Sequence, residues 1–155
     1  MKDPFSRPKI RTGLFYHNPI AALDWIEKAF GFTRSMDIRD QHGELVHAEM
    51  TFGHASIIID SEWSDFVASP LSNQGVNTQI IYVQLENDIE QHCEHARFCG
   101  AEIIQEPESQ YYGDCVYRAK DIEGHVWTFS QAIRDIGKAE AEQLGEVKIS
   151  GWHRD

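Results

Sequence analysis

One histidine and one carboxylate in this sequence, His47 and Glu49, are spaced for joint chemistry. They lie in an alternating run from Glu44 to Phe52 that is typical of a β-strand, so both side chains are expected on one face. Such a pair could act as a general base, bind a ligand, or hold a metal with a third residue such as His17 or His54. An ordinary polar pair explains them as well, since a buried carboxylate needs a donor.

Arg118 offers a means of recognising a small molecule. Its planar donor fork could bind a carboxylate, phosphonate or enolate oxygen, although a salt bridge with Asp114 or Asp121 would also account for it. Aromatic residues in the predicted loops either pack or form a rim that stacks on a flat ligand. These aromatic residues are Trp63, Phe66, Tyr111 and Tyr112.

Length, composition and charge exclude several classes of protein. The chain has 155 residues, of which 41% are hydrophobic, as expected for one globular domain. Its net charge of −11 argues against a nucleic-acid partner and favours a cationic ligand over an anionic one. No apolar run approaches the roughly 20 residues of a membrane helix, and no signal peptide is evident, so we expect a cytoplasmic protein with no membrane partner. Its three cysteines fit neither a disulfide framework nor a thiolate zinc site.

A weak internal repeat with an offset of about 70 residues organises the chain. Asn18 and Asn87 each begin a predicted helix, and Gly31 and Gly100 end these helices. Pro19 suits the first helical position. Each helix is preceded by one predicted strand and followed by three more, which gives the order βαβββ twice. The predicted strands are 10–16, 32–39, 44–52 and 54–60 in the first half, and 78–85, 101–105, 115–120 and 125–130 in the second.

These patterns predict an α+β fold with one domain and a C-terminal tail. The domain spans residues 1–131, with modules at about 9–62 and 76–131 and a linker or lid at 63–75. The tail, 132–155, is predicted to be helical in its first part. Because its valine, isoleucine and tryptophan would be costly to expose, we expect it to dock on the domain or on a dimer partner.

Two segments carry a resemblance to a known family. They are Ala21 to Phe32 and the run from Tyr112-Gly113-Asp114 into Arg118 to Phe129. With the paired modules, they resemble the glyoxalase, bleomycin-resistance and extradiol-dioxygenase superfamily, also called the vicinal oxygen chelate superfamily, over about residues 9 to 131. The resemblance implies two curved mixed sheets around a cleft, with the open face of each sheet lining the cleft and its other face packed on a helix. It also implies a homodimer.

With that fold, strand alternation predicts which side chains face the cleft. His47 and Glu49 face it, and pseudo-symmetry places Arg118 opposite His47, so we expect a polar pair with Arg118 across the cleft or hydrogen bonds to a ligand. Trp127 and Phe129 are expected to face the helix. The predicted lining is His47, Glu49, Arg118, Thr128, Tyr16, Ser56, Ile58, Thr78, Tyr82 and Gln84. The predicted ligand-binding residues are His47, Glu49, Arg118, Tyr82, Gln84, Thr128, Trp63 and Tyr111.

The resemblance also implies where a metal would be held in metal-dependent members. Aligned from the helix starts, those positions fall on Thr12, Ile58, Ile80 and Thr128, none of which is a histidine, glutamine or glutamate. We therefore expect no cofactor, and a divalent metal is the less favoured alternative.

Two classes of function remain. We favour a metal-independent small-molecule-binding protein, for example one that sequesters an antibiotic or toxin. The alternative is a lyase, isomerase or dioxygenase that uses a divalent metal, or Glu49 or His47 as general base with Arg118 stabilising an oxyanion. No residue is assigned a catalytic role from the sequence.

Overall fold

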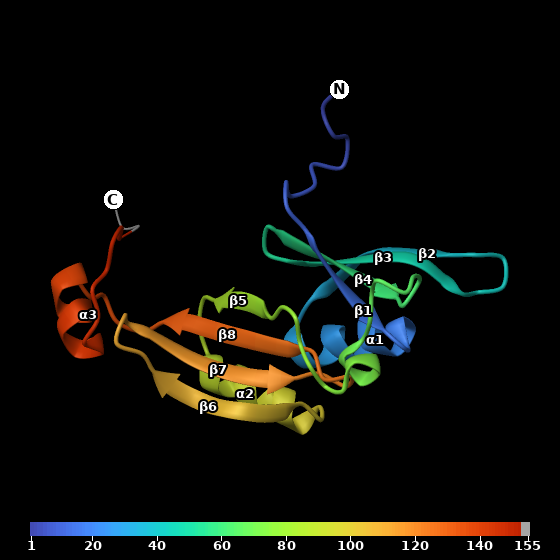
Figure 1. The fold of residues 1–155 in the computed structure, drawn as a ribbon. Helices are drawn as coiled ribbons and strands as arrows, with labels where there is room; N and C mark the ends of the chain where they lie inside the picture. Colours follow the sequence, from blue (N-terminus) through green and yellow to red (C-terminus); the bar gives the residue numbers. More distant parts are fainter. Residues whose placement is uncertain (153–155) are drawn as a thin grey trace.

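The first predicted module forms a four-stranded sheet with one helix, as the repeat indicates. We describe residues 1–152 from a computed structural model (Figure 1). The strands pair in the order β1-β4-β3-β2, with β1 parallel to β4 and the other neighbours antiparallel. The elements of this module are β1 (Thr12–Tyr16), α1 (Pro19–Phe30), β2 (Thr33–Arg39), β3 (Leu45–Phe52) and β4 (Ala55–Ser61).

The second module repeats this arrangement. Its strands pair in the order β5-β8-β7-β6, again with only the first pair parallel. The α+β fold of two βαβββ modules with mixed sheets is thus confirmed. The elements of this half are β5 (Ile81–Leu85), α2 (Ile89–Phe98), β6 (Glu102–Ser109), β7 (Asp114–Lys120) and β8 (Val126–Ala132). A short 3-10 turn, Pro70–Asn73, lies in the linker, and α3 (Lys138–Gly145) follows the second module.

The two module helices begin and end differently. In α1 the side chain of Asn18 accepts a hydrogen bond of 3.0 Å from the Ala21 amide, and Gly31 takes the left-handed conformation that ends the helix, as predicted. The prediction that Asn87 caps α2 is wrong. Asp88 precedes α2 with φ of 56° and makes no side-chain cap. The helix α2 has 10 residues, whereas α1 has 12.

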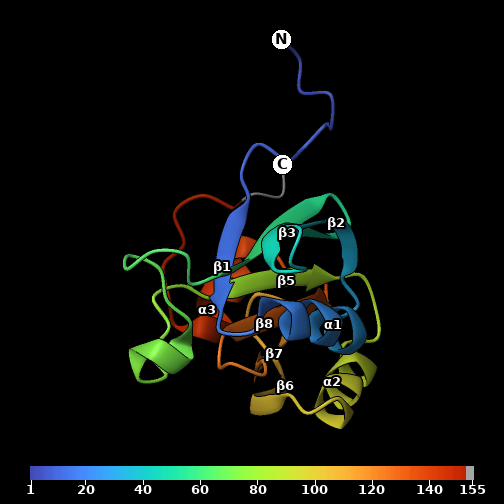
Figure 2. The same cartoon turned by 90° about the vertical axis from the view of Figure 1, so that its right-hand side faces the viewer.

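A single hydrophobic core joins the modules. Phe30, at the end of α1, packs against Trp127 and Phe129 of β8, with ring centroids 5.0 and 4.8 Å apart. Both β8 residues therefore face the helices, as expected. The two helices lie side by side (Figure 2), and His92 of α2 contacts the Phe30 carbonyl oxygen at 3.1 Å. We call the opposite face of each sheet, which the helices leave uncovered, its outer face.

The turn between β7 and β8 fastens the second module to the end of β1. The hydroxyl of Tyr16 donates to Asp121, and the Glu123 carboxylate accepts from the amides of His17 and Asn18 at 2.7 and 2.9 Å. The prediction that Tyr16 lines the cleft is wrong. It is fully buried, because it lies two residues after the core residue Leu14 on β1 and therefore points to the same face of the strand.

The C-terminal tail contacts its own chain. Ile136, just before α3, is buried, and the amides of Ile133 and Arg134 both donate to the Gly113 carbonyl at 3.0 Å. Ala141 of α3 is also buried. Within residues 1–152, every helix is too short or too polar to cross a membrane.

Candidate functional site

Arg118 lies on the outer face of the second sheet, between two uncharged partners. The strand register places Thr128 and Gln105 beside it on the neighbouring strands. Its Nε donates to the Thr128 hydroxyl at 3.2 Å, and its Nη1 donates to the Gln105 side-chain oxygen. In the described part of the chain no carboxylate forms an ion pair with it, and Asp121 is engaged by Tyr16 and Trp127 instead. The guanidinium is therefore held in place without being neutralised.

Tyr82 of β5 lies beside Thr128, the partner of Arg118, and two further tyrosines lie in the turn that leads into β7. Tyr111 and Tyr112 lie edge to face, with centroids 5.1 Å apart. Burial raises the pKa of Tyr112, Asp114 raises it further, and the positive charge of Arg118 opposes the rise, while Tyr111 and Tyr82 exert weaker effects. The three tyrosine rings are only partly buried, so they can contact a flat molecule.

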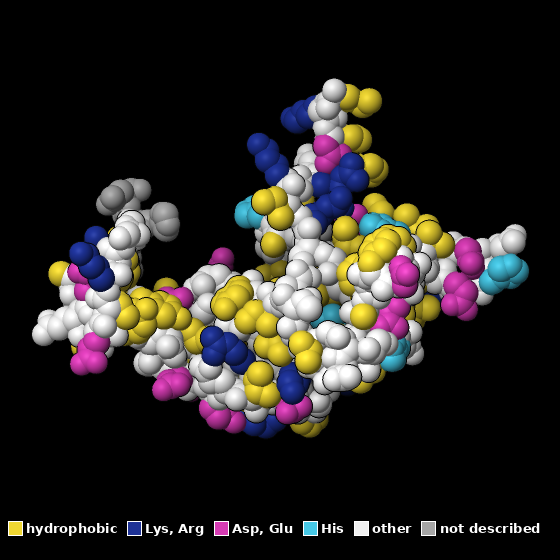
Figure 3. Space-filling model, in the orientation of Figure 1, with side chains coloured by type: hydrophobic (Ala, Val, Ile, Leu, Met, Phe, Trp, Pro, Cys, Tyr) yellow, Lys and Arg dark blue, Asp and Glu magenta, His cyan; other side chains and the backbone are white. Residues whose placement is uncertain are grey.

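Gln84 of β5 completes this face of the sheet. It accepts from the Ser130 hydroxyl at 3.1 Å and donates to Asp114 at 3.5 Å. The structure thus brings together five of the predicted ligand-binding residues, and we call the set the arginine face. In Figure 3 hydrophobic and uncharged surface predominates over β5, β7 and β8, with few charged side chains. The arginine face consists of Arg118, Thr128, Gln105, Tyr82, Gln84, Tyr111 and Tyr112.

The other predicted pair lies on the outer face of the first sheet. His47 Nε2 is 2.9 Å from Glu49 Oε1, and Arg11 donates to the same oxygen. Burial alone would raise the pKa of Glu49, but the hydrogen bonds from His47 and Arg11 outweigh it and hold that pKa below its ordinary value. The predicted polar pair exists, but its cation is Arg11 and not Arg118. The sequence analysis missed Arg11. Its position two residues before Gly13 in the extended chain could have placed it on this face.

The positions at which metal-dependent members would hold an ion do not fit a metal here. Thr12 pairs with Ile57 and lies two residues before buried Leu14, so its side chain points to the core side of β1. Ile80 precedes β5. The strand register gives a corrected set of outward-facing positions. That set is Gly13, Ile58, Tyr82 and Thr128, which again supplies neither imidazole nor carboxylate.

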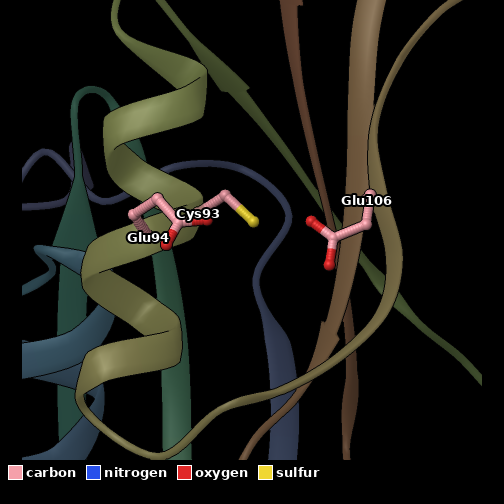
Figure 4. A group of neighbouring side chains, drawn as sticks. All are labelled: Cys93, Glu94 and Glu106. Atoms are coloured by element: carbon pink, nitrogen blue, oxygen red, sulfur yellow. The ribbon is translucent and has the colours of Figure 1, made fainter.

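One other cluster has metal-binding residue types, but it is arranged as an ion pair. Cys93 and Glu94 of α2 lie near Glu106 of β6, and Figure 4 shows the sulfur directed toward Glu106. Arg97 donates to Glu106 at 2.6 Å and to Glu94 at 3.2 Å, so both carboxylates are already paired with a cation of the protein. Burial raises the pKa of the Cys93 thiol to about 11, so the thiolate needed for coordination is disfavoured. Among the described residues this is the one group of that kind, and His47 and Glu49 have no third ligand near them.

A pocket of about 800 Å³ lies between β5 of the second module and the β3–β4 turn of the first. Tyr82 and Gln84 of the arginine face line it, together with Ile10 and Ser56 from the first module. The Ser56 hydroxyl is buried and has no hydrogen-bond partner in residues 1–152. The predicted ligand-binding residue Trp63 lies instead in the linker, edge to face with Phe66 at 5.0 Å.

Comparison with known proteins agrees with this architecture. The family model of the Glyoxalase/Bleomycin resistance protein/Dioxygenase superfamily matches residues 10–129. The uncharacterized protein Rv0887c of Mycobacterium tuberculosis is 22% identical over 139 residues, which cover 87% of this chain and 81% of that protein.

Solved structures share the fold at low sequence identity. TioX from Micromonospora sp. ML1 superposes with a TM-score of 0.63 at 23% identity, covering 81% of this chain and 99% of that one. A member of the same superfamily from Sphaerobacter thermophilus gives 0.65 at 15% identity, covering 80% and 97%.

Proposed function

This chain belongs to the glyoxalase/bleomycin resistance protein/dioxygenase superfamily, and we propose that it binds a small planar molecule at the arginine face without a metal. The observation that carries the proposal is the setting of Arg118. Two uncharged side chains orient its guanidinium, and Tyr82 lies beside one of them, Thr128, on the neighbouring strand. Sequestration of an antibiotic or toxin is a role of this kind, since it requires binding and no chemistry.

The arrangement favours a ligand that joins a flat ring to an acceptor oxygen. Hydrogen bonds to a charged group contribute about 1.5–3 kcal/mol each, and a ring stacked on tyrosine adds buried area. The net charge of −11 acts against an anion at long range, but salt screens such charges beyond roughly 8 Å. At contact distance Arg118 therefore outweighs the net charge, and a carboxylate or enolate oxygen is the favoured partner.

We further propose that the protein is a homodimer. The helices join both modules in one core, and β1 and β5 lie at free sheet edges beside the 800 Å³ pocket. Ile10 and Tyr82, which line this pocket, are strongly exposed in one chain. A second copy would cover these residues. The outer face of its first sheet would then lie over the arginine face, so that His47 and Glu49 of one subunit come close to Arg118 of the other.

The catalytic alternative is less well supported. A general base must accept a proton near neutral pH, but Glu49 is paired with Arg11 and its pKa lies below the ordinary value. The metal-dependent route lacks ligands at the corresponding positions. The pair at Glu49 is better suited to hydrogen-bonding a ligand than to proton abstraction.

A fluorescence titration with two matched compounds tests the proposal. The compounds are 2-naphthoate and 2-naphthylmethylammonium, which share the ring and differ in charge. We expect 2-naphthoate to bind, and Arg118→Met to weaken its affinity by about tenfold or more, while Arg97→Met leaves it unchanged. Tighter binding of the ammonium compound, or equal binding to wild type and Arg118→Met, would overturn the proposal.

A further inference from the structure

The C-terminal tail packs against the turn that carries two tyrosines of the arginine face. The Gly113 carbonyl of this β6–β7 turn accepts the amides of Ile133 and Arg134, and a Cβ added to Gly113 would lie 2.5 Å from the Arg134 carbonyl oxygen. Figure 1 shows α3 at that end of the second sheet. The backbone of the tail and that of the turn are thus in direct contact.

Gly145, the last residue of α3, contacts the ring of Tyr111. A Cβ added to Gly145 would lie 2.6 to 2.8 Å from three carbons of that ring, closer than real Cβ atoms approach. The backbone of Gly145 is ordinary in conformation, so the glycine is needed for space and not for a left-handed φ. The Tyr111 ring therefore rests on the helix end, and any larger residue there must displace it.

The chain after α3 is held in place by Glu142. The Glu142 carbonyl accepts the Val147 amide at 3.1 Å, and its carboxylate accepts the Ile149 amide at 2.7 Å. These bonds fold the chain back on α3, in which Ala141 is buried. The helix end is accordingly a firm support for the ring.

We propose that α3 is a specificity element of the binding site, with Gly145 as the positioning residue that sets the place of Tyr111. Tyr111 transmits this position to Tyr112 through their edge-to-face contact, and both rings lie in the turn that leads into β7, the strand of Arg118. The inference rests on the proposed function, because it says that the tail determines the shape of the space that holds the flat part of the ligand.

Two alanine substitutions in the same tail test this. Gly145→Ala should weaken 2-naphthoate affinity by about tenfold, while the higher helix propensity of alanine offsets part of the loss of Tm that displacing the ring causes. Gly137→Ala, at the start of α3 where an added Cβ meets nothing within 4 Å, is the matched control and should leave both unchanged. In a Tyr111→Ala background Gly145→Ala should have no further effect, since the ring it displaces is gone. Additive effects of the two substitutions, or unchanged affinity in Gly145→Ala, would overturn the inference.

A ligand-free readout separates this inference from the proposed function. The NMR signals of the Arg118 Nε–H and of the Tyr112 ring should shift in Gly145→Ala and not in Gly137→Ala. Absence of these shifts overturns the positioning role, whatever the binding result. If the shifts occur but wild type does not bind 2-naphthoate, the proposed function fails while the positioning of Tyr111 by α3 is supported.

Discussion

Tyr16 and Asp121, which lie 105 residues apart in sequence, form a buried hydrogen bond of 2.6 Å that joins the two modules. Asp121 also accepts the Trp127 indole N–H at 3.0 Å and two backbone amides of its own turn. Its carboxylate is thus fully used inside the protein. The orientation of one sheet relative to the other depends on this residue.

Replacement of Tyr16 by phenylalanine should lower the free energy of unfolding by about 1–3 kcal/mol. The ring stays in the core, but the buried carboxylate loses one donor, and hydrogen bonds to charged groups have this magnitude. Urea unfolding near neutral pH measures the change. Phe66→Leu, in the exposed part of the linker, is the control and should have little effect. Equal stability of Tyr16→Phe and wild type would show that the bond does not hold the modules together.

His92 should make the fold less stable in mild acid. Burial lowers its pKa, and its Nε2 donates to the Phe30 carbonyl while its Nδ1 accepts from the Tyr117 hydroxyl at 2.6 Å. Between the lowered pKa of the folded state and about 6.5 in the unfolded state, the unfolded chain binds more protons. Stability therefore falls as pH drops below about 6.5 and levels off below the folded pKa.

Urea unfolding at several pH values, in wild type and in His92→Gln, checks this dependence. The variant should lose part of the slope below about pH 6.5, because it cannot titrate. His42→Gln, on the exposed β2–β3 turn, should retain the wild-type slope. If His92→Gln also retained it, another group would be responsible.

Removal of metal should leave ligand binding unchanged. The outward-facing residues at the corrected metal positions lack suitable donors, and the carboxylates near Cys93 are paired with Arg97. We expect the same 2-naphthoate affinity before and after EDTA treatment, and less than stoichiometric metal by mass spectrometry of the purified protein. Stoichiometric Ni²⁺, Zn²⁺ or Mn²⁺ bound by His47 or Glu49 in crystals would contradict the metal-independent account.

Mixing two variants should reveal whether the cleft is shared between subunits. His47→Ala and Arg118→Met homodimers should each bind 2-naphthoate weakly, because each loses a donor of the shared site, and random exchange of subunits should restore about a quarter of the sites to the wild-type pair. A titration of the mixture measures the restored fraction. If each site lay within one chain, mixing would restore nothing.

The order of elements could be predicted from the sequence, since it depends on local patterns. The cap of α1 follows from Asn18, Pro19 and Gly31, and the alternation of β8 correctly placed Trp127 and Phe129 in the core. The predicted cap of α2 failed because Asp88 takes a left-handed conformation without a side-chain bond.

The site was less predictable, because it depends on register and on distant partners. Alignment from the helix starts assigned Ile80 as the β5 position, but the parallel pairing with β8 places Tyr82 beside Thr128. The sequence pattern could have placed Arg11 on the face of Glu49, but Arg118 can supply the same donor, and only the fold shows which of the two lies near the carboxylate. Tyr16 was misplaced because its phenol has a buried partner, Asp121, more than a hundred residues away.

The most direct test of the account follows the Arg118 Nε–H signal by NMR while metal-free protein is titrated with 2-naphthoate. We predict a saturable shift of this signal together with those of the Tyr82 and Tyr111 rings, at the same apparent affinity as the fluorescence change. Saturable binding that leaves the Arg118 signal unmoved would contradict a ligand site at the arginine face.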